Sequence, residues 1–238
     1  MGRHYQLKGS LDVPQIADIC CNKNYILVPE ELQKVFESYD YEDFSFCVTK
    51  VDFSSEPLSI YLSMDVEGFI EEKSIQQKWL LQAVGLRKNR ISSDYASNII
   101  IKEDHPLLWE FTDSQCELYF NGQCTKPEGL FVELYKIYFE LFRSAEPFKR
   151  CLNSNDPFQL IQENNGLLAR GPKKLMTKYA SCLTKYGLDY SIIGERPAKY
   201  WNGEIFNEER SDLKILFMND TDTFIIAEDF VFNKTGSV

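Results

Sequence analysis

Two kinds of reactive side chain are scarce in this sequence. It contains only two histidines, His4 and His105, and none of its seven cysteines forms a C-x-x-C pair. Because zinc sites combine His and Cys ligands at short spacings, the sequence argues against a zinc centre. The sequence also lacks the glycine-rich fingerprints of dinucleotide-binding and P-loop proteins, and the G-x-S-x-G motif of serine hydrolases. We therefore expect no cofactor and no metal, and we assign no catalytic residue.

Long apolar segments are also lacking. The sequence has no run of about 18 apolar residues, the length that a membrane-spanning helix needs. Near the N-terminus, Gly9, Ser10, Asp12 and Pro14 interrupt the apolar core of a signal peptide. The 26 basic residues are outnumbered by 36 acidic ones, which gives a net charge of −10. Because nucleic acids and anionic membranes attract basic proteins, we expect neither as a partner and predict a cytoplasmic protein.

What the sequence does contain suits an ordinary folded core. Hydrophobic residues make up 44% of the chain, and 13 Tyr and 17 Phe provide large apolar side chains. A chain of this size can bury enough surface to fold without disulfides or metal. We expect reduced cysteines, with no bond between Cys116 and Cys124. We predict a single domain over residues 1–238, with a weak subdivision near 98–125.

Hydrophobic spacing predicts both helices and strands. Helices are expected at residues 29–39, 71–84, 126–143 and 172–186, and residues 86–97 are expected to be a loop. Strands are expected at residues 44–53, 58–66, 98–102, 107–111, 116–120, 188–193, 213–218 and 223–232, with tight turns at Asn121-Gly122 and Asn202-Gly203. Because the strands follow one another in hairpins, we predict an α+β fold with mostly antiparallel sheet and several amphipathic helices packed on it.

The prediction of two of these helices depends on specific local signals in the sequence. In residues 71–84, the apolar side chains of Ile75, Trp79 and Ala83 recur every four residues, which is the spacing of one helix face. For the helix over 126–143, Thr125 and Glu128 match a capping box, in which each side chain accepts a hydrogen bond from the other's backbone amide.

The most suggestive motif for ligand binding lies at the predicted start of the helix over 172–186. A helix start attracts anions through its free N–H groups and positive dipole end. Basic side chains cluster there, and we predict an anion-binding site formed by Arg170, Gly171, Lys173, Lys174 and Lys178. Its ligand would be a phosphate, a sulfate or a carboxylate-rich partner loop. A solvated basic face that balances an acidic protein explains the same pattern.

Three further features have ordinary alternatives. A histidine such as His105 can serve as a general base, but we favour the interpretation that it is a partly exposed loop residue. The run Asn219-Asp220-Thr221-Asp222 has clustered oxygen atoms, but such runs are typical of tight turns and not of cation sites. The basic run Arg87-Lys88-Asn89-Arg90 follows a predicted helix end, where cations are favourable. Whether this run joins residues 170–178 in one groove for an anion stays open.

Two functions follow from these observations. The first is a non-catalytic binding module, such as an inhibitor or immunity-type protein that recognises a basic protein partner through acidic and aromatic surface. Tyr200 and Trp201 are its candidate contact residues, although core packing also explains aromatic strands. The second is an enzyme or sensor for a phosphorylated small molecule bound around Arg170–Lys174. We favour the binding module, because the sequence shows no recognisable catalytic signature.

Overall fold

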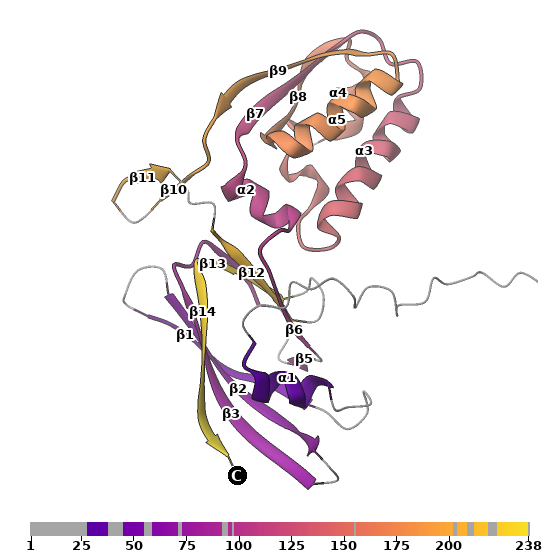
Figure 1. The fold of residues 1–238 in the computed structure, drawn as a ribbon. Helices are drawn as coiled ribbons and strands as arrows, with labels where there is room; N and C mark the ends of the chain where they lie inside the picture. The colour runs from indigo at the N-terminus through magenta and orange to yellow at the C-terminus, as the bar shows by residue number, and fades with distance from the viewer. Residues whose placement is uncertain are drawn as a thin grey trace, which may run out of the picture.

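The computed structural model describes residues 28–37, 45–54, 59–70, 73–91, 95–96, 98–154, 156–201, 204–208, 212–218 and 223–237. Over these residues the fold is α+β, and every strand pair is antiparallel, as the sequence predicts (Figure 1). The expectations for His4, Asn202-Gly203 and residues 219–222 lie outside the described residues.

The largest sheet has five strands in the order β14-β3-β2-β1-β5. Its strands are β1 (Ser45–Phe53), β2 (Ser59–Ile70), β3 (Lys73–Val84), β5 (Tyr95–Ala96) and β14 (Asp229–Ser237). Alternate side chains of β2 and β3, such as Leu62 and Leu81, are fully buried on one face. Helix α1 (Glu30–Glu37) adds Leu32 and Val35 to the same core.

A second sheet of four strands lies between this core and the rest of the protein. Its order is β4-β13-β12-β6, with β4 (Lys88–Arg90), β6 (Ile99–Lys102), β12 (Lys214–Met218) and β13 (Thr223–Ala227). Leu216 and Ile225 pack toward the five-stranded sheet, whereas Phe217 and Phe224 pack toward the other core. Because both faces are covered, β12 and β13 are almost uniformly apolar.

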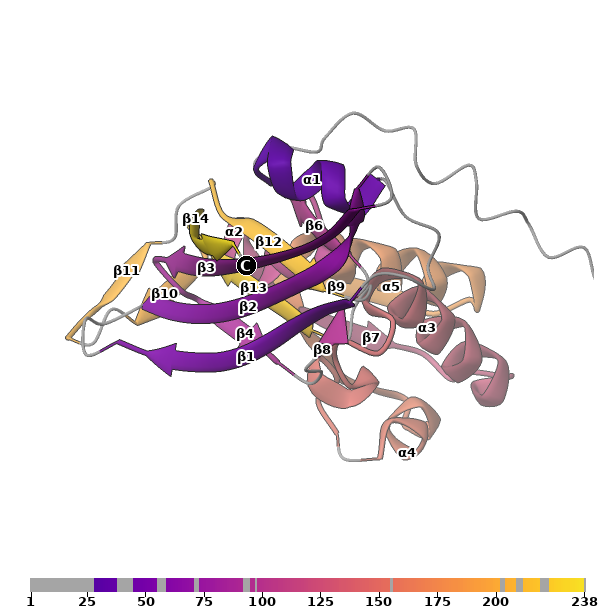
Figure 2. The same cartoon turned by 90° about the horizontal axis from the view of Figure 1, so that it is seen from below.

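The third part combines a three-stranded sheet with helices. The sheet has the order β8-β7-β9, with β7 (Gln115–Asn121), β8 (Asn165–Pro172) and β9 (Asp189–Arg196). The helices are η2 (Pro106–Leu108), α2 (Trp109–Thr112), α3 (Pro127–Phe142), η3 (Phe148–Arg150), α4 (Pro157–Gln162) and α5 (Lys173–Lys185). Helix α5 packs on the sheet and α3 packs on α5 (Figure 2).

The chain crosses between the five-stranded and four-stranded sheets at two neighbouring points. Gly85 follows β3, and Glu228 separates β13 from β14. The amide of Glu228 donates to the carbonyl oxygen of Val84 at 2.9 Å, which ties the two crossings together. Gly85 has φ +66°, and a Cβ there would lie 2.5 Å from the Glu228 side chain. A glycine is therefore required at this corner.

The prediction of a helix over residues 71–84 is wrong, because residues 73–84 form strand β3. Trp79, Leu81 and Ala83 alternate on the buried face, and Gln77 continues that row at 6% exposure. The polar Gln77 hides the two-residue period in the sequence. In the structure it is tolerated because its Oε1 accepts a hydrogen bond from Trp79 Nε1 at 2.9 Å.

The prediction of a strand over residues 107–111 is also wrong, because η2 and α2 occupy them. Pro106 at the first helical position favours this turn, and His105 Nδ1 accepts from the amide of Leu107 at 3.2 Å. Residues 86–97, expected to be a loop, include strands β4 and β5. Strand β4 is short and polar, and β5 has only two residues, so their sequences carry little periodicity.

Two predicted local motifs do not form. The amide of Gly122 donates to the carbonyl of Asn164, and β7 pairs with β8 and β9, so Asn121-Gly122 is not the turn of a hairpin. Lys126 is the N-cap of α3 and makes no side-chain capping bond, so the Thr125–Glu128 box is not formed. By contrast, the helix predicted over 172–186 is confirmed as α5. Among the described cysteines, Cys116 and Cys124 are both free.

Candidate functional site

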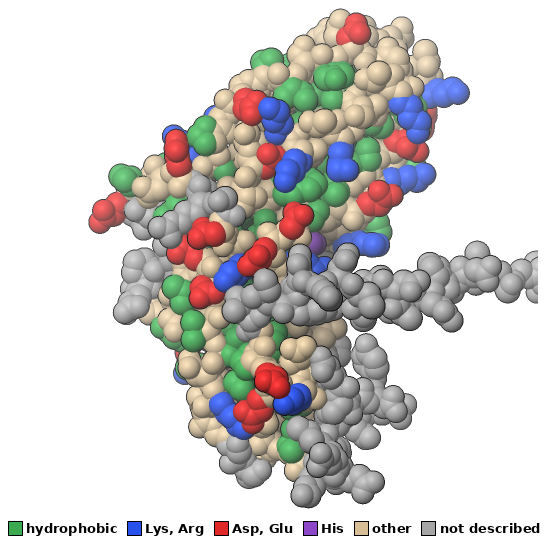
Figure 3. All heavy atoms as spheres, viewed as in Figure 1, with side chains coloured by type: hydrophobic (Ala, Val, Ile, Leu, Met, Phe, Trp, Pro, Cys, Tyr) green, Lys and Arg blue, Asp and Glu red, His purple; other side chains and the backbone are tan. Residues whose placement is uncertain are grey.

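A two-stranded ribbon projects from the body of the protein (Figure 1). It pairs β10 (Lys199–Trp201) with β11 (Phe206–Glu208), and Trp201 lies directly opposite Phe206. The centres of these two rings are 5.0 Å apart. Trp201 is 50% exposed, Ile205 59% and Phe206 66%. The ribbon therefore presents a compact apolar surface to solvent, and Figure 3 shows apolar and acidic side chains side by side at this projecting end.

The ribbon is anchored through Tyr200. The guanidinium carbon of Arg87 lies 3.7 Å from the centre of the Tyr200 ring. The Arg87 side chain is only 2% exposed and pairs with Glu228 at 2.7 Å. A cation over an aromatic ring is attracted more strongly where water is excluded. Because successive strand residues point to opposite faces, Tyr200 faces the body and Trp201 faces outward, so the two candidate contact residues have different roles.

The predicted anion site lies at the start of α5, but carboxylates already contact it. Asp113 accepts a hydrogen bond from the amide of Lys174 at 2.7 Å. Lys173 pairs with Glu195 at 2.7 Å, and Arg170 pairs with Glu117 at 3.1 Å. An external anion would have to displace these internal partners. The anion-binding role of Arg170, Gly171, Lys173, Lys174 and Lys178 stays a prediction.

The structure divides these five residues between two surfaces. Lys173, Lys174 and Lys178 line an open hollow of about 490 Å³ together with Trp109, Asp113 and Thr177. The ammonium group of Lys174 lies 5.4 Å from the centre of the Trp109 ring. Arg170 and Gly171 instead line a separate, more enclosed cavity. Gly171 and Pro172 are the last two residues of strand β8, and α5 begins directly after them at Lys173.

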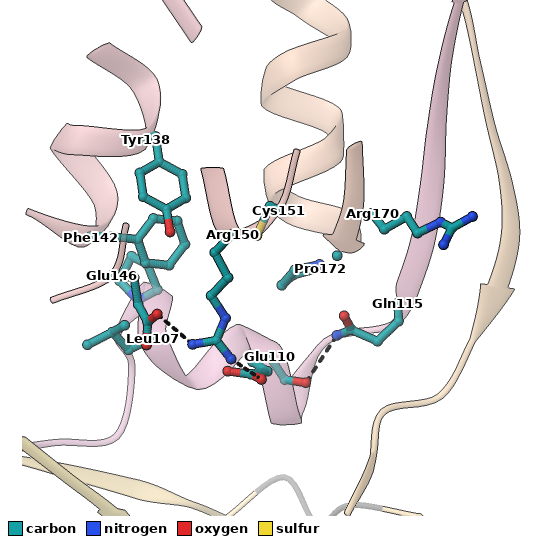
Figure 4. Close-up of a pocket in the computed structure, with 12 residues that line it drawn as sticks. Leu107, Glu110, Gln115, Tyr138, Phe142, Glu146, Arg150, Cys151, Arg170 and Pro172 are labelled. Carbon is teal, nitrogen blue, oxygen red and sulfur yellow. Dashed lines mark hydrogen bonds and ion pairs between the residues drawn. The ribbon is translucent and has the colours of Figure 1, made fainter. Parts of the chain in front are cut away.

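The enclosed cavity has a volume of about 150 Å³ and lies where α2, α3 and β8 meet (Figure 4). Its walls combine apolar side chains such as Leu107, Phe142 and Pro172 with polar ones. In Figure 4 the Arg150 guanidinium points between Glu110 and Glu146, whereas the Arg170 guanidinium points away from the cavity. His105 and Lys173 do not line it.

The charges around this cavity neutralise one another. Arg150 pairs with Glu110 at 2.6 Å and with Glu146 at 2.5 Å, and Lys88 pairs with the same two carboxylates. Burial on its own would raise the pKa of Glu146, but hydrogen bonds from Lys88 and Arg150 lower that pKa overall. Two cations thus balance two carboxylates, and the network links β4 to α2 and to residues 146–150.

The thiol in this cavity is a poor nucleophile. Burial raises the pKa of Cys151 to about 11, so the thiol stays protonated near neutral pH. Burial likewise raises the pKa of the Tyr138 phenol. Neither group is poised for proton transfer or nucleophilic attack at neutral pH.

His105 is a structural residue in this fold. Burial, followed by the charge of Lys102, lowers its pKa to about 4, although Asp104 opposes this shift. Its ring packs edge-on against Phe217, with centroids 4.8 Å apart, and its Nδ1 caps η2. A neutral imidazole with its Nδ1 already accepting a hydrogen bond does not match the general base that the sequence allows.

The basic run Arg87-Lys88-Asn89-Arg90 does not follow a helix end. Its last three residues form strand β4. Arg87 pairs with Glu228, and Lys88 with Glu110 and Glu146. Arg90 donates to the carbonyl oxygens of residues 144 and 145. The run approaches residues 170–178 through Glu110, which lines the cavity with Arg170. These cations therefore bind groups of the same chain. The sequence did not predict these contacts, because the partners are distant in the chain.

Further findings concern metals, membranes and related proteins. Within the described ranges, no three His, Cys, Asp or Glu side chains come together as a metal site requires. In the same residues no helix is long and apolar enough to cross a membrane. Comparison of the chain with protein-family models, with curated proteins and with solved structures finds no match.

Proposed function

We propose that this chain is a non-catalytic binding module that recognises a basic protein partner through the β10–β11 ribbon. The observation that carries the proposal is the exposed apolar surface of Trp201, Ile205 and Phe206 on a projecting ribbon. Aromatic side chains dominate the energetics of protein interfaces, and Trp is the type most enriched at their centres. Contiguous exposed apolar side chains with polar residues around them are typical of protein interaction sites.

The charges around this surface support a basic partner. Glu204 and Glu208 lie on the ribbon and are exposed, and the whole chain carries a net charge of −10. Carboxylates at the rim of an interface accelerate association with a cationic partner and make it sensitive to salt. We propose the partner surface as an apolar socket surrounded by Lys and Arg. An inhibitor or immunity-type protein is one concrete form of this function.

The proposal retains two expectations from the sequence. The partner is a protein and not a nucleic acid or a membrane, because the chain is strongly acidic. The place of action is the cytoplasm.

A pull-down from native lysate tests the proposal with the full chain as bait. The wild type is expected to retain a basic protein at low salt and to release it at high salt. The double variant Trp201→Ala with Phe206→Ala is expected to lose that protein, because truncating two central aromatic side chains lowers the affinity at least about 30-fold. Phe53→Ala is the matched control, since Phe53 is also 66% exposed but lies on β1. Equal capture by the double variant would contradict the proposal.

Intrinsic fluorescence gives a second readout once a partner is isolated. Trp79 is buried and Trp109 is partly buried, so Trp201 is the most exposed of the three tryptophans. We expect binding to change the emission of the wild type, and Trp201→Phe to remove most of that change. A change that persists in Trp201→Phe would place the contact elsewhere.

The alternative function is an enzyme or sensor for a phosphorylated small molecule at Arg170–Lys174. It is less well supported, because Asp113 already accepts from the Lys174 amide and Glu117 and Glu195 pair with the nearby cations. A thermal-shift screen with nucleotides and sugar phosphates distinguishes the two functions. A shift that disappears in Lys173→Ala with Lys174→Ala would favour the alternative.

A further inference from the structure

The three-stranded sheet has one covered edge and one open edge. At the β8 edge, the amide of Arg170 donates to the carbonyl of Cys151, and the amide of Asn153 donates to the carbonyl of Leu168. The segment around residues 151–153 therefore covers β8. No strand in the described part of the chain pairs with the outer edge of β9. An open edge of eight residues is a template for pairing with another strand.

The side chains of β9 are unusually exposed for a strand of this length. Seven of its eight residues are exposed, and they include two large hydrophobic side chains, Tyr190 at 47% and Ile193 at 51%. Asp189 and Arg196, at the two ends of the strand, make no ion pair with any other described residue. Glu195, next to Arg196, already pairs with Lys173 of the same chain at 2.7 Å. The strand thus has an acidic residue at one end, an apolar centre, and at the other end a basic residue whose neighbouring carboxylate is already paired.

A bulge sets which of these side chains share a face. Ile193 lies opposite Glu117 and Arg196 lies opposite Gln115, so Gly194 and Glu195 together occupy one position of the ladder. Gly194 has φ +69°, which suits a bulge. Because residues directly opposite in a ladder point to the same face, Asp189, Ser191, Ile193 and Arg196 lie on one face.

This pattern is complementary to itself. If two β9 strands run antiparallel with Ile192 opposite its own copy on a twofold axis, Ser191 lies opposite Ile193. Counting the bulge as one position, Asp189 then lies opposite Arg196 of the second copy. The symmetry repeats this pair at the other end of the interface, as in any interface where the same surface is used by both subunits. Opposite charges that face each other across two strands stabilise their pairing.

We propose that two copies of this chain associate edge to edge through β9 and form a continuous six-stranded antiparallel sheet. The occupant of the open edge is the second copy, because the charge pattern of β9 matches its own reverse. Asp189 and Arg196 hold the register, and Ile193 is covered by the second copy. The ribbon surface around Trp201 takes no part in this contact, so the inference does not depend on the proposed function.

Charge exchange tests the register. Sedimentation velocity of the wild type is expected to show a monomer–dimer equilibrium that weakens at high salt. Asp189→Arg places Arg opposite Arg196, and Arg196→Asp places Asp opposite Asp189. Each single change is expected to weaken the dimer about tenfold, because two exposed pairs turn from attraction to repulsion. An equimolar mixture of the two variants restores both pairs, as does the double variant, and both are expected to dimerise like the wild type.

Matched controls separate this effect from net charge and from folding. Asp212→Arg and Lys199→Asp make the same charge changes at exposed positions outside β9, and they are expected to leave the dimer unchanged. Circular dichroism verifies that all variants fold. A wild type that stays monomeric at every concentration would overturn the inference. So would a mixture of the two single variants that dimerises no better than each variant alone. Trp201→Ala with Phe206→Ala is expected to dimerise normally, so failure of either proposal can be recognised separately.

Discussion

Arg87 and Tyr200 form a cation–π contact of 3.7 Å that joins the projecting ribbon to the junction of two sheets. Arg87 also pairs with Glu228 and donates to the carbonyl oxygen of Gly85, so three distant segments meet at one buried guanidinium. Because Arg is always charged and its planar group can stack and donate at once, few other side chains could make these contacts together.

The Arg87–Tyr200 contact predicts a stability difference between two substitutions. Tyr200→Leu is expected to lower the free energy of unfolding by about 1–2 kcal/mol, because it removes a ring from a desolvated cation. Tyr200→Phe keeps the ring and is expected to stay close to the wild type. Urea denaturation of the three proteins measures the difference. Equal losses for Leu and Phe would mean that the hydroxyl, and not the ring, stabilises the ribbon.

The buried Gln77–Trp79 hydrogen bond predicts non-additive effects. Gln77→Leu is expected to destabilise the protein by about 1–3 kcal/mol, because it leaves the Trp79 N–H buried without its acceptor. Trp79→Phe in the Gln77→Leu background removes that orphaned donor, so the double variant is expected to lose less than the two single losses combined. A double-mutant cycle in urea provides the test, and strict additivity would contradict the argument.

Arg143 adopts a backbone conformation that favours glycine. It is the residue after α3, with φ 49° and ψ −132°, and it is the one non-glycine with positive φ among the described residues. Arg143→Gly is expected to raise the free energy of unfolding by about 1 kcal/mol, and Arg143→Val to lower it by at least as much. Thermal unfolding compares the three proteins. A destabilised Arg143→Gly would show that the contact of Arg143 with Phe139 outweighs the strain.

The partly buried His105 predicts a pH dependence of stability. Its pKa is about 4 in the folded protein, below the reference value of 6.5, so the folded state disfavours the protonated imidazole. Its contribution is therefore complete above pH 6.5 and is lost as the pH falls toward 4, by at most about 3 kcal/mol. His105→Asn keeps a side-chain acceptor for the Leu107 amide but does not titrate. The difference in stability between variant and wild type is expected to change between pH 7 and pH 4, and a constant difference would contradict the assigned pKa.

The sequence predicted some parts of the candidate site and missed others. The sequence offered Trp201 as a candidate contact residue and left core packing as the alternative; the structure shows its side chain half exposed, and its role in binding stays a prediction. The anchoring role of Tyr200 could not be predicted, because Arg87 lies more than a hundred residues away in the chain. The ion pairs beside the cavity could not be predicted for the same reason, because Lys88 reaches Glu110 and Glu146 only after the sheets have packed.

The sequence by itself determined the antiparallel α+β class, the acidic character and helix α5, because these depend on composition and on apolar spacing within one segment. Only the tertiary structure decided that residues 73–84 form a strand, since a buried Gln77 becomes acceptable once Trp79 supplies its partner. Tertiary structure likewise decided that the cations of residues 87–90 hold sheets and helices together. The free energy of an ion pair depends on where its partner lies and how much water remains there, and neither quantity is written in a local pattern.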